Sequence, residues 1–571
     1  MPLSHAAEYY LGLVKIEGPV DLPQSDISAL QTFLSELEAL PEQTNYLDHI
    51  SHSKSPEIAA KIDGSIQPLS TVIVMLRNIL SPIRRVPLEI LSYIFVLVCS
   101  TDFIDYDAGH ILAVGGVCKA WRNALYAATP RVWSTFFVNI SSHWNLLLDD
   151  DAPSVKQWLT RSLGMPLDIE LVFTVPEDDS DCGPNVTWRP VNAAFMHKAK
   201  CVIDSVIEFS QQIRSIQVKA STEVFPLLTC FNELEFPLLE TISLTILVES
   251  NIQAFSPDTP ISLLNAPKLC NARLVEPVNP SRPVLDSFHI PLSQLTSLSL
   301  DLRSLGGHSD PQNGLAEVLL ECQNLITLRI LTGRCYAALT LSPPVHLPCL
   351  RSLELSYHSA TLQADNRDSL LKYITAPTLE HLTLRCDVPY RYVVDGSNLV
   401  DFQTRSSISL RSLNLVEFHL SRADELSINF FENRVIPILA ACPTVHSFEM
   451  ALEEYVQLNL LFKAMTYTKG QPVILPYITH LSLGATEAEC GCKHDWYCPS
   501  ELVHMIQSRI QGEEESNGVV VARLQKVVLT DVGRTAVNFQ EIYNLPNLEV
   551  HVEAFPYSNH LEEVGKNLSM Q

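Results

Sequence analysis

The chain has 571 residues, of which 46% are apolar and 18% are charged, and its formal net charge at pH 7 is -25. This composition excludes wholesale disorder, and the length predicts either several domains or one elongated repeat array. The excess of negative charge argues against nucleic acid or an anionic membrane as a partner, because both require a basic face.

The cysteine pattern and the longest apolar run bear on the compartment. The 14 cysteines follow no regular framework, and the first residues lack the basic start, apolar centre and cleavage site of a secretory signal. The run from Leu88 to Cys99 is about a dozen residues, short of the roughly 20 that span a bilayer. We therefore expect free thiols in a cytoplasmic and/or nuclear protein without a membrane helix.

Two segments near the N-terminus share a helical apolar period. Their seams are Ile27, Leu30, Leu34 and Leu37, then Leu69, Ile73, Leu76, Leu80 and Ile83. The polar link between them, from Pro41 to about Ser65, predicts a helical hairpin. A dimerising coiled coil is the alternative, although each seam is shorter than the three or four heptads that a coiled coil sustains.

The stretch from Pro82 to Trp133 has the apolar spacing of a small helical docking unit. A very apolar helical run follows Val86-Pro87, and polar and acidic residues from Cys99 to Asp107 interrupt it. A second helical pattern starts at Ile111, and Thr129-Pro130 with Trp133 closes the unit. About 50 residues cannot bury all these apolar side chains, so some remain for a partner. The alternative is that they only form the core of the unit.

A linking segment leads from this unit into the rest of the chain. Residues Val155 to Leu171 predict a helix, a turn at Gly164-Met165-Pro166 and a short strand. The acidic clusters at Asp149 to Asp151 and Glu177 to Asp181 are typical of solvated surface.

Downstream, a Leu-x-x-Leu-x-Leu unit recurs, often with a proline two residues before its first leucine. The copies begin at Ile213, Leu239, Leu269, Leu295, Leu325, Leu350, Leu379, Leu410, Val445, Ile478, Leu524 and Leu548. Eleven steps over 335 residues give a mean period of about 30 residues. The Leu-x-Leu alternation predicts a strand with one buried face, and such units must stack into a parallel-sheet solenoid.

Helical patterns lie between several of the predicted strands. They run from Gly314 to Cys322, Asp368 to Thr375, Asn433 to Ala441 and Glu501 to Ile510. The 46-residue step from Ile478 to Leu524 indicates one long insertion.

The helical unit resembles the F-box domain, in the pieces that read here VPLEI, IF, VCKAWR and TPRVW. The repeats, from about Gln211 to Glu553, resemble leucine-rich repeats. Leucine-rich repeats usually have an asparagine three residues after the last strand leucine, and this asparagine is missing here. Its absence argues against a smooth, regular horseshoe, but not against the solenoid. Those positions hold Arg303, Gly333, His358, Asp387 and Phe418. The combination most resembles the large F-box families of mushroom-forming fungi.

This resemblance implies an α plus α/β organisation in five parts. They are an N-terminal region with the helical hairpin (1–81), a three-helix F-box (82–135), a linking helix and strand segment that caps the solenoid (136–210), an irregular leucine-rich-repeat solenoid (211–554) with a parallel β-sheet on its concave face, and a C-terminal tail (555–571).

F-box domains dock on a linker of the Skp family and thereby join a cullin-RING ubiquitin ligase. The residues at the matching positions are Val86, Pro87, Glu89, Ile90, Ile94, Phe95, Val117, Trp121 and Arg122. The resemblance thus implies a substrate-recognition adaptor of such a ligase, with the solenoid binding an unknown target protein. The alternative is a non-degradative scaffold for protein assembly.

Two further groups of residues are candidate sites. On the predicted concave face, Arg329, His381 and Arg385 form a possible basic spot, with Glu354 beside them, that could receive an acidic or phosphorylated target segment. In the long insertion, Cys490, Cys492, His494 and Cys498 are zinc ligand types, but their compressed spacing favours an exposed loop with free thiols. We expect no cofactor.

Catalytic motifs are absent from the sequence. It contains no G-x-S-x-G, no phosphate-binding G-x-x-x-x-G-K-[ST], no G-x-G-x-x-G after a strand and no H-E-x-x-H. The function expected is therefore binding, without covalent chemistry on this chain.

Overall fold

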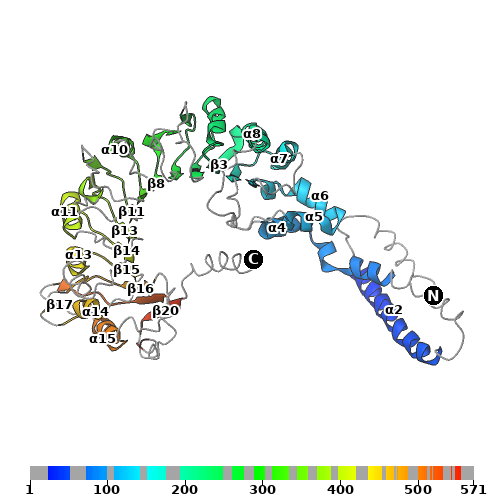
Figure 1. The fold of residues 1–571 in the computed structure, drawn as a ribbon. Coiled ribbons are helices and arrows are strands. Elements are labelled where there is room, and N and C mark those ends of the chain that lie inside the picture. The colour runs from blue at the N-terminus through cyan, green and yellow to red at the C-terminus, as the bar shows by residue number, and fades with distance from the viewer. Residues whose placement is uncertain are drawn as a thin grey trace, which may run out of the picture. The chain divides into compact units, whose positions relative to one another are not determined.

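A computed structural model describes the chain in segments (Figure 1). The described residues are 23–51, 72–99, 109–141, 151–174, 193–247, 260–275, 288–302, 312–332, 344–357, 370–386, 396–418, 435–452, 458–468, 471, 473–485, 499–510, 515–516, 519–530, 542, 545 and 547–553. They fall into two compact units, one of residues 1–137 with 150–169 and one of residues 138–149 with 170–571.

The N-terminal helices pack through their predicted seams. Helix α2 (Gln24–Ser51) and the helix over residues 72–80 share one apolar core. Its buried members are Ile27, Leu30, Leu37, Leu76 and Ile79. Two details of the prediction are wrong. Helix α2 continues past Pro41 to Ser51, and Ile83 lies exposed beyond Pro82, which ends the second helix.

The predicted docking unit is a small helical unit with its own core. Its elements are η1 (Pro82–Arg85), α4 (Leu88–Cys99), α5 (Gly109–Val117), α6 (Lys119–Ala128) and η3 (Pro130–Trp133). The buried members of the core are Leu91, Phe95, Cys99, Ile111, Val114, Ala124, Leu125, Val132 and Trp133. Helices α4, α5 and α6 and the turn η3 therefore all contribute to this core.

The segment that follows adds a helix and two strands. Its elements are β1 (Thr135–Ser141), α7 (Asp151–Thr160) and β2 (Leu167–Thr174). The predicted helix, turn and strand are confirmed, and β1 is an additional strand. Gly164 has φ +83°, the left-handed conformation that glycine adopts without steric cost. Trp158 of α7 packs against the core of the helical unit.

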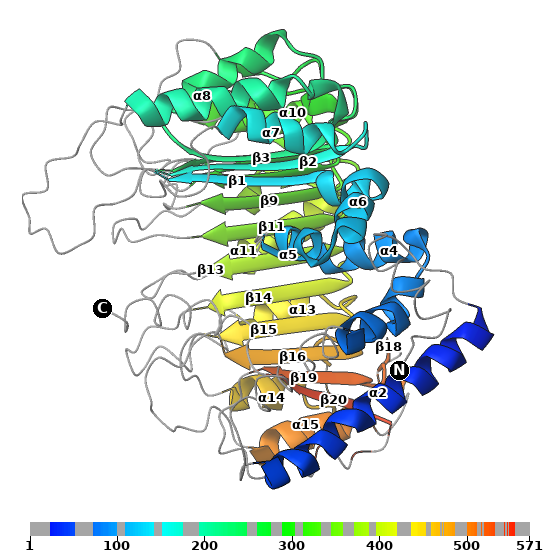
Figure 2. The ribbon, with the colours of Figure 1, turned by 90° about the vertical axis from the view of Figure 1, so that its right-hand side faces the viewer.

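A single long sheet dominates the second unit. Its repeat strands are β3 (Ile213–Ser221), β4 (Thr241–Leu247), β6 (Asn271–Val275), β8 (Ser297–Leu302), β9 (Thr327–Thr332), β11 (Ser352–Tyr357), β13 (His381–Cys386), β14 (Ser412–Phe418), β15 (Ser447–Leu452), β16 (His480–Ala485), β19 (Lys526–Thr530) and β20 (Glu549–Glu553). With β1 and β2 they form 14 strands, and all twelve repeat strands follow one another in chain order (Figure 2). Every neighbouring pair from β3 to β20 is parallel.

The predicted motif copies each supply one strand. In the eleven copies from Ile213 to Leu529, all three apolar positions are buried. In-register pairing stacks equivalent positions on each other, for example Leu353 on Leu328 and Leu382 on Leu353. The parallel solenoid is thus confirmed, since each unit buries its apolar face only against its neighbours.

A carbonyl ladder links the repeats where the chain enters each strand. The carbonyl of Arg351 accepts hydrogen bonds from the amides of Glu380 (2.9 Å) and His381 (2.9 Å), and the carbonyl of Glu380 does the same for Arg411 (2.8 Å) and Ser412 (3.0 Å). At each strand entry from Glu240 to Thr479, one carbonyl accepts hydrogen bonds from two consecutive amides of the next repeat in the same way. Threonines reinforce it, because the Thr378 hydroxyl donates to the Pro348 and Leu350 carbonyls of the preceding repeat. These bonds connect repeats that lack the usual asparagine.

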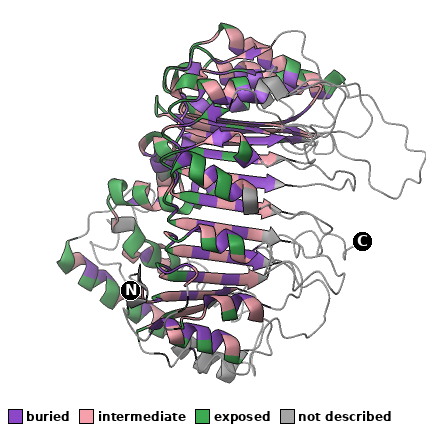
Figure 3. Ribbon diagram, turned by 90° about the vertical axis from the view of Figure 1, so that its left-hand side faces the viewer, coloured by how far each residue is buried: buried purple, intermediate pink, exposed green. Residues whose placement is uncertain are grey.

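The outer layer is less regular than the sheet. Its described elements are α8 (Ala193–Ile207), η4 (Ser210–Gln212), η5 (Phe225–Glu233), η6 (Leu292–Gln294), α10 (Gln312–Glu321), η7 (Leu370–Lys372), α11 (Gly396–Ser406), α13 (Ile436–Ala441), α14 (Asn459–Met465) and α15 (Pro499–Ile510), with the two-residue strands β5 (Ile261–Ser262), β7 (Phe288–His289), β10 (Val345–His346), β12 (Ile374–Thr375), β17 (Glu515–Ser516) and β18 (Val519–Val520). Figure 3 shows exposed residues along the helices of this layer and buried ones along the strands.

Three of the predicted interstrand helices agree with α10, α13 and α15 to within a few residues. The helix predicted over Asp368 to Thr375 is wrong where the structure describes it. Residues 370–372 form a single 3-10 turn, and Ile374 and Thr375 form β12. These β-branched residues pair with Val345 and His346 of β10, and this tertiary pairing overrides the weak helical pattern.

Two arginines of the outer helices hold the loops of preceding repeats. Arg405 of α11 donates to the Leu371 and Ile374 carbonyls. Arg509 of α15 donates to the carbonyls of Met465 (2.7 Å) and Leu475 (2.8 Å), and also to that of Ile474. Such buried carbonyls need donors, and each guanidinium supplies several at once.

Among the described helices, none combines the length and apolar character that a membrane crossing requires.

Candidate functional site

Helix α4 has an apolar core face and an apolar exposed face. Leu91, Phe95 and Cys99, spaced by four residues, point into the core of the helical unit. On the opposite side, Ile90, Tyr93 and Leu97 are 53%, 63% and 58% exposed. We call these three residues the α4 outer face. A helix that is apolar all round is normally buried on all sides, so this face indicates a binding surface.

Exposed apolar residues continue onto the neighbouring helix. Leu112 and Val117 of α5 are both exposed, as are Leu88 and Val98 of α4. The Arg122 guanidinium of α6 donates through Nε to the Gly115 carbonyl at 3.0 Å, which ties α6 to the end of α5. The apolar surface is therefore carried by helices that are bonded to one another.

The structure separates the predicted linker-binding residues by exposure. Exposed are Pro87, Glu89, Ile90, Val117 and Arg122; partly buried are Val86, Ile94 and Trp121; and Phe95 is buried. At 1% exposure, Phe95 packs on Trp121 with ring centroids 5.1 Å apart. It supports the surface from inside the core and has no area to offer a partner. Sequence reasoning missed Tyr93, Leu97 and Leu112, because periodicity cannot say which side of an all-apolar helix is covered.

The concave face of the solenoid carries a row of mainly polar and charged side chains. The row that lies between the two buried strand positions consists of Gln217, Ser243, Arg273, Ser299, Arg329, Glu354, Thr383, Asn414, Glu449, Ser482, Val528 and His551. We call this row the floor of the sheet.

The four predicted target-binding residues lie on three neighbouring strands. Arg329 of β9 and Glu354 of β11 are register partners, and their Nε and Oε1 atoms are 3.1 Å apart. His381 of β13 lies 4.0 Å from the Glu380 carboxylate. Arg385, two residues beyond the floor position of β13, acts electrostatically on Glu449 of β15. Each predicted cation therefore has a carboxylate neighbour, so the spot is electrically mixed.

Glu449 is a carboxyl group of this floor whose charged form is disfavoured by burial. Burial raises the pKa of Glu449, and the positive charge of Arg385 opposes the rise. A raised folded-state pKa means that this carboxyl favours folding below its unfolded pKa and loses that contribution as pH rises through the folded pKa.

We therefore expect Glu449→Gln to stabilise the solenoid at pH 7 but not at pH 3.5. The gain is below about 1 kcal/mol, because the carboxylate is partly solvated and Arg385 compensates. Thermal unfolding of wild type and variant at both pH values measures it. A variant that is less stable than wild type at pH 7 would show instead that the attraction to Arg385 dominates.

A second charge cluster on this face joins β2 and β3. Glu170, although buried, accepts hydrogen bonds from Lys219 Nζ (2.7 Å) and Gln217 Nε2 (2.8 Å). A buried carboxylate with two donors is satisfied, so this cluster stabilises the sheet and leaves little for a ligand.

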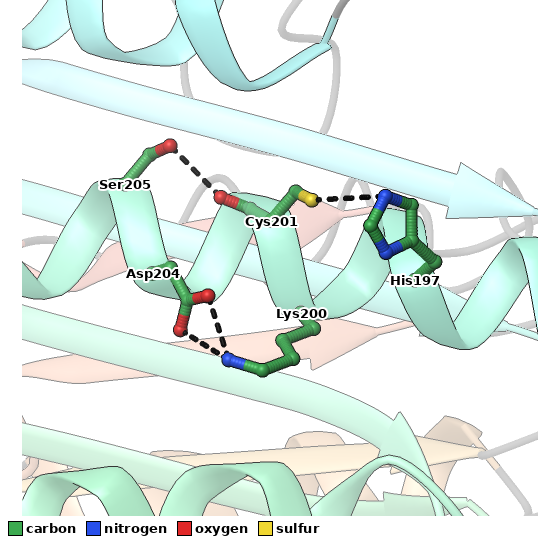
Figure 4. Close-up of polar contacts among 5 residues, drawn as sticks. All are labelled: His197, Lys200, Cys201, Asp204 and Ser205. Atoms are coloured by element: carbon green, nitrogen blue, oxygen red, sulfur yellow. Dashed lines mark hydrogen bonds and ion pairs between the residues drawn. The ribbon is translucent and has the colours of Figure 1, made fainter.

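Helix α8 has a polar face on its outer side (Figure 4). Lys200 pairs with Asp204 at 2.7 Å, and the Cys201 sulfur lies 3.6 Å from His197 Nε2. The hydroxyl of Ser205 donates back to the Cys201 carbonyl at 2.8 Å. All three bonds join residues one helical turn apart. Those of the exposed Lys200 and His197 are the pattern of a solvated helix surface, whereas Ser205 is buried.

The zinc candidate, Cys490, Cys492, His494 and Cys498, lies outside the described residues. Within the described part of the chain, no group of three or more histidine, cysteine or acidic residues could hold a metal ion. Eight of the cysteines in that part, Cys99, Cys118, Cys201, Cys230, Cys270, Cys322, Cys349 and Cys442, are free thiols. Burial raises the pKa of Cys322 and of Cys442 to about 12, and that of Cys230 to about 11. These three thiols therefore stay protonated and inert at neutral pH.

No protein-family model matches the chain, and no curated protein matches it. The F-box and leucine-rich-repeat resemblance therefore rests on the sequence motifs and stays a prediction.

Proposed function

We propose that the protein is a substrate-recognition adaptor of a Skp-cullin-F-box ubiquitin ligase. In this proposal the helical unit is an F-box that docks on a Skp-family linker, and the solenoid binds a target protein. The observation that carries the proposal is the α4 outer face, an exposed apolar stripe on a helix whose other side is already in a core. Such a stripe costs solubility unless a partner covers it.

The solenoid supports the second half of the proposal. An open parallel sheet of 14 strands presents a long row of polar side chains, and extended surfaces of this kind are used to bind proteins. The target's lysines would gain a high effective concentration near the charged ubiquitin, because both are held on one assembly. The chain itself supplies position and no covalent chemistry.

Linker binding tests the proposal. We expect the full chain to co-purify with a Skp-family linker and a cullin, and Ile90→Asp with Leu97→Asp to weaken linker binding at least about 100-fold, because buried unpaired carboxylates cost several kcal/mol. Both side chains are exposed in the free protein, so the variant keeps its fold.

Val74→Asp is the matched control, since Val74 is an exposed apolar residue on the helix over residues 72–80, which precedes the helical unit. Equal linker binding by wild type and the Ile90/Leu97 variant would refute the docking claim. The scaffold alternative would be favoured if linker and cullin co-purify with the protein but no other protein accumulates in cells from which it has been deleted.

A further inference from the structure

The edge where the chain enters the sheet carries a row of cationic and imidazole side chains. Arg351, His381, Arg411, His446 and His480 belong to five consecutive sheet strands, β11, β13, β14, β15 and β16, at the first strand residue or the residue before it. We call these five residues the strand-entry strip. The carbonyl ladder links their strands through the Arg351, Glu380, Arg411 and His446 carbonyls, and all five residues are exposed.

The strip has an electrostatic character opposite to that of the whole protein. The two entry positions of these five strands hold two arginines, three histidines and only one carboxylate, Glu380, on a chain of net charge -25. Arg411 lies 3.6 Å from Glu380 with 68% of its side chain exposed. Arg351 has no side-chain hydrogen bond or ion pair among the described residues. Both guanidinium groups therefore have donors for a further anion.

Two of the three histidines, His446 and His480, are held with one nitrogen turned to the protein. His446 Nδ1 lies 2.7 Å from the Thr444 carbonyl, to which it donates, and its ring stacks on Tyr477 with an interplanar angle of 16°. The Thr479 hydroxyl donates to the His446 carbonyl and so accepts from His480 Nδ1 at 2.8 Å. In both rings, Nε2 is the nitrogen left for a ligand.

We propose that the strand-entry strip binds an extended acidic segment of the target protein. This proposal rests on the solenoid being the target-binding part. Arg351 and Arg411 are two strands apart, about 10 Å, which an extended chain spans in about three residues. The segment it fits carries carboxylates at positions i and i+3, and its backbone lies across the row of Ser352, Ser412 and Ser447 beside the strip.

Carboxylates fit the strip better than phosphate does. Glu380 lies at the start of β13, between the strands of the two arginines, and its carboxylate already contacts Arg411. A dianionic phosphate that bridged both guanidinium groups would have to approach this carboxylate, and the repulsion grows with the charge of the ligand. Two separate monoanions can each approach one arginine from the solvent side.

Fluorescence anisotropy with the full-length protein tests the proposal. The probe is a labelled Gly/Ser peptide with two glutamates three residues apart, and matched peptides carry glutamine or phosphoserine at the same positions. We expect the glutamate peptide to bind at least about 10-fold more tightly than the glutamine peptide, and its affinity to fall with salt.

Variants then locate the site. We expect Arg351→Glu with Arg411→Glu to weaken binding of the glutamate peptide about 10-fold or more, and Glu380→Gln to strengthen it about 2-fold. Lys463→Glu, the same kind of charge reversal on the outer helix α14, should leave binding unchanged. Equal binding by wild type and the double variant, or an equal loss with Lys463→Glu, would overturn the proposal.

Two outcomes separate this inference from others. Phosphoserine binding more than about 10-fold tighter than glutamate would overturn the carboxylate assignment, because it implies a dianion site. Linker binding by the Arg351/Arg411 variant should equal that of wild type. If the wild-type protein binds the linker but does not bind the glutamate peptide, the strip proposal is lost and the adaptor proposal stands.

Discussion

Replacing Arg509 with methionine should lower the free energy of unfolding of the C-terminal repeats by about 3 to 5 kcal/mol, because a buried acceptor without a donor costs about 1 to 3 kcal/mol and the effects of neighbouring groups do not simply add. Arg509 is 1% exposed and is the donor to three carbonyls of the 465–475 segment. Burial lowers its pKa to about 10, so it remains a cation at neutral pH. Methionine fills much of the volume but donates nothing.

Hydrogen exchange measures this effect locally. We expect faster exchange in peptides covering 458–485 and 499–510, with little change in the first repeats, because each repeat of a solenoid is stabilised mainly by its neighbours. Arg411→Met is the matched control, since Arg411 is largely exposed. Arg509→Lys keeps the charge but cannot reach three carbonyls, and should be intermediate. An Arg509→Met variant as stable as the control would contradict the prediction.

Replacing Trp133 with alanine should unfold the helical unit or destabilise it by about 3 to 5 kcal/mol, the usual cost of removing a buried tryptophan. Trp133 is buried, and its indole Nε1 donates to the Leu125 carbonyl at 2.9 Å. Its ring packs edge-on against Trp158 at 4.7 Å and lies beneath the Arg161 guanidinium. The change removes packing between η3, α6 and α7 together.

Tyr93→Ala distinguishes loss of the fold from loss of the surface. Tyr93 is exposed on the α4 outer face, so its removal should change stability by less than about 0.5 kcal/mol while weakening linker binding. Urea unfolding and linker binding are measured for both variants. Unchanged unfolding of the Trp133→Ala variant would contradict the role of Trp133 in the core. Unfolding of the Tyr93→Ala variant would show that Tyr93 supports the fold and is not only part of a binding surface.

The repeats were predictable because their signal is local. The motif that begins at Leu350 places its three leucines at spacings of three and two, and that spacing alone predicts a turn anchor followed by a strand with one buried face. All three are buried in the structure. The same argument holds for the seam of Leu30 and Leu37, whose spacing of seven residues places both on one side of a helix.

The irregular outer layer was less predictable. Residues 374 and 375 pair with a segment almost 30 residues earlier, and a helical pattern of eight residues contains no information about that partner. Arg509 gave no sequence signal either, since a basic residue near the end of an amphipathic helix is ordinarily solvated. Only the packing of α15 on the 465–475 segment buries it.

The candidate sites were also predictable only in their local features. Sequence patterns marked α4 as apolar, but Ile90 and Phe95 look equivalent until a core forms on one side of the helix. The predicted basic spot named residues on the correct face, yet the pairing of Arg329 with Glu354 depends on the register between β9 and β11.

The sequence by itself determined that this protein has a small apolar helical unit and a stacked parallel sheet, because helical and strand periods are written in residues a few positions apart. The tertiary structure decided which side of α4 faces solvent and which charges meet on the solenoid. Those contacts join residues about 30 positions apart, such as Arg351, His381 and Arg411, and only the register of neighbouring repeats brings them into one strip.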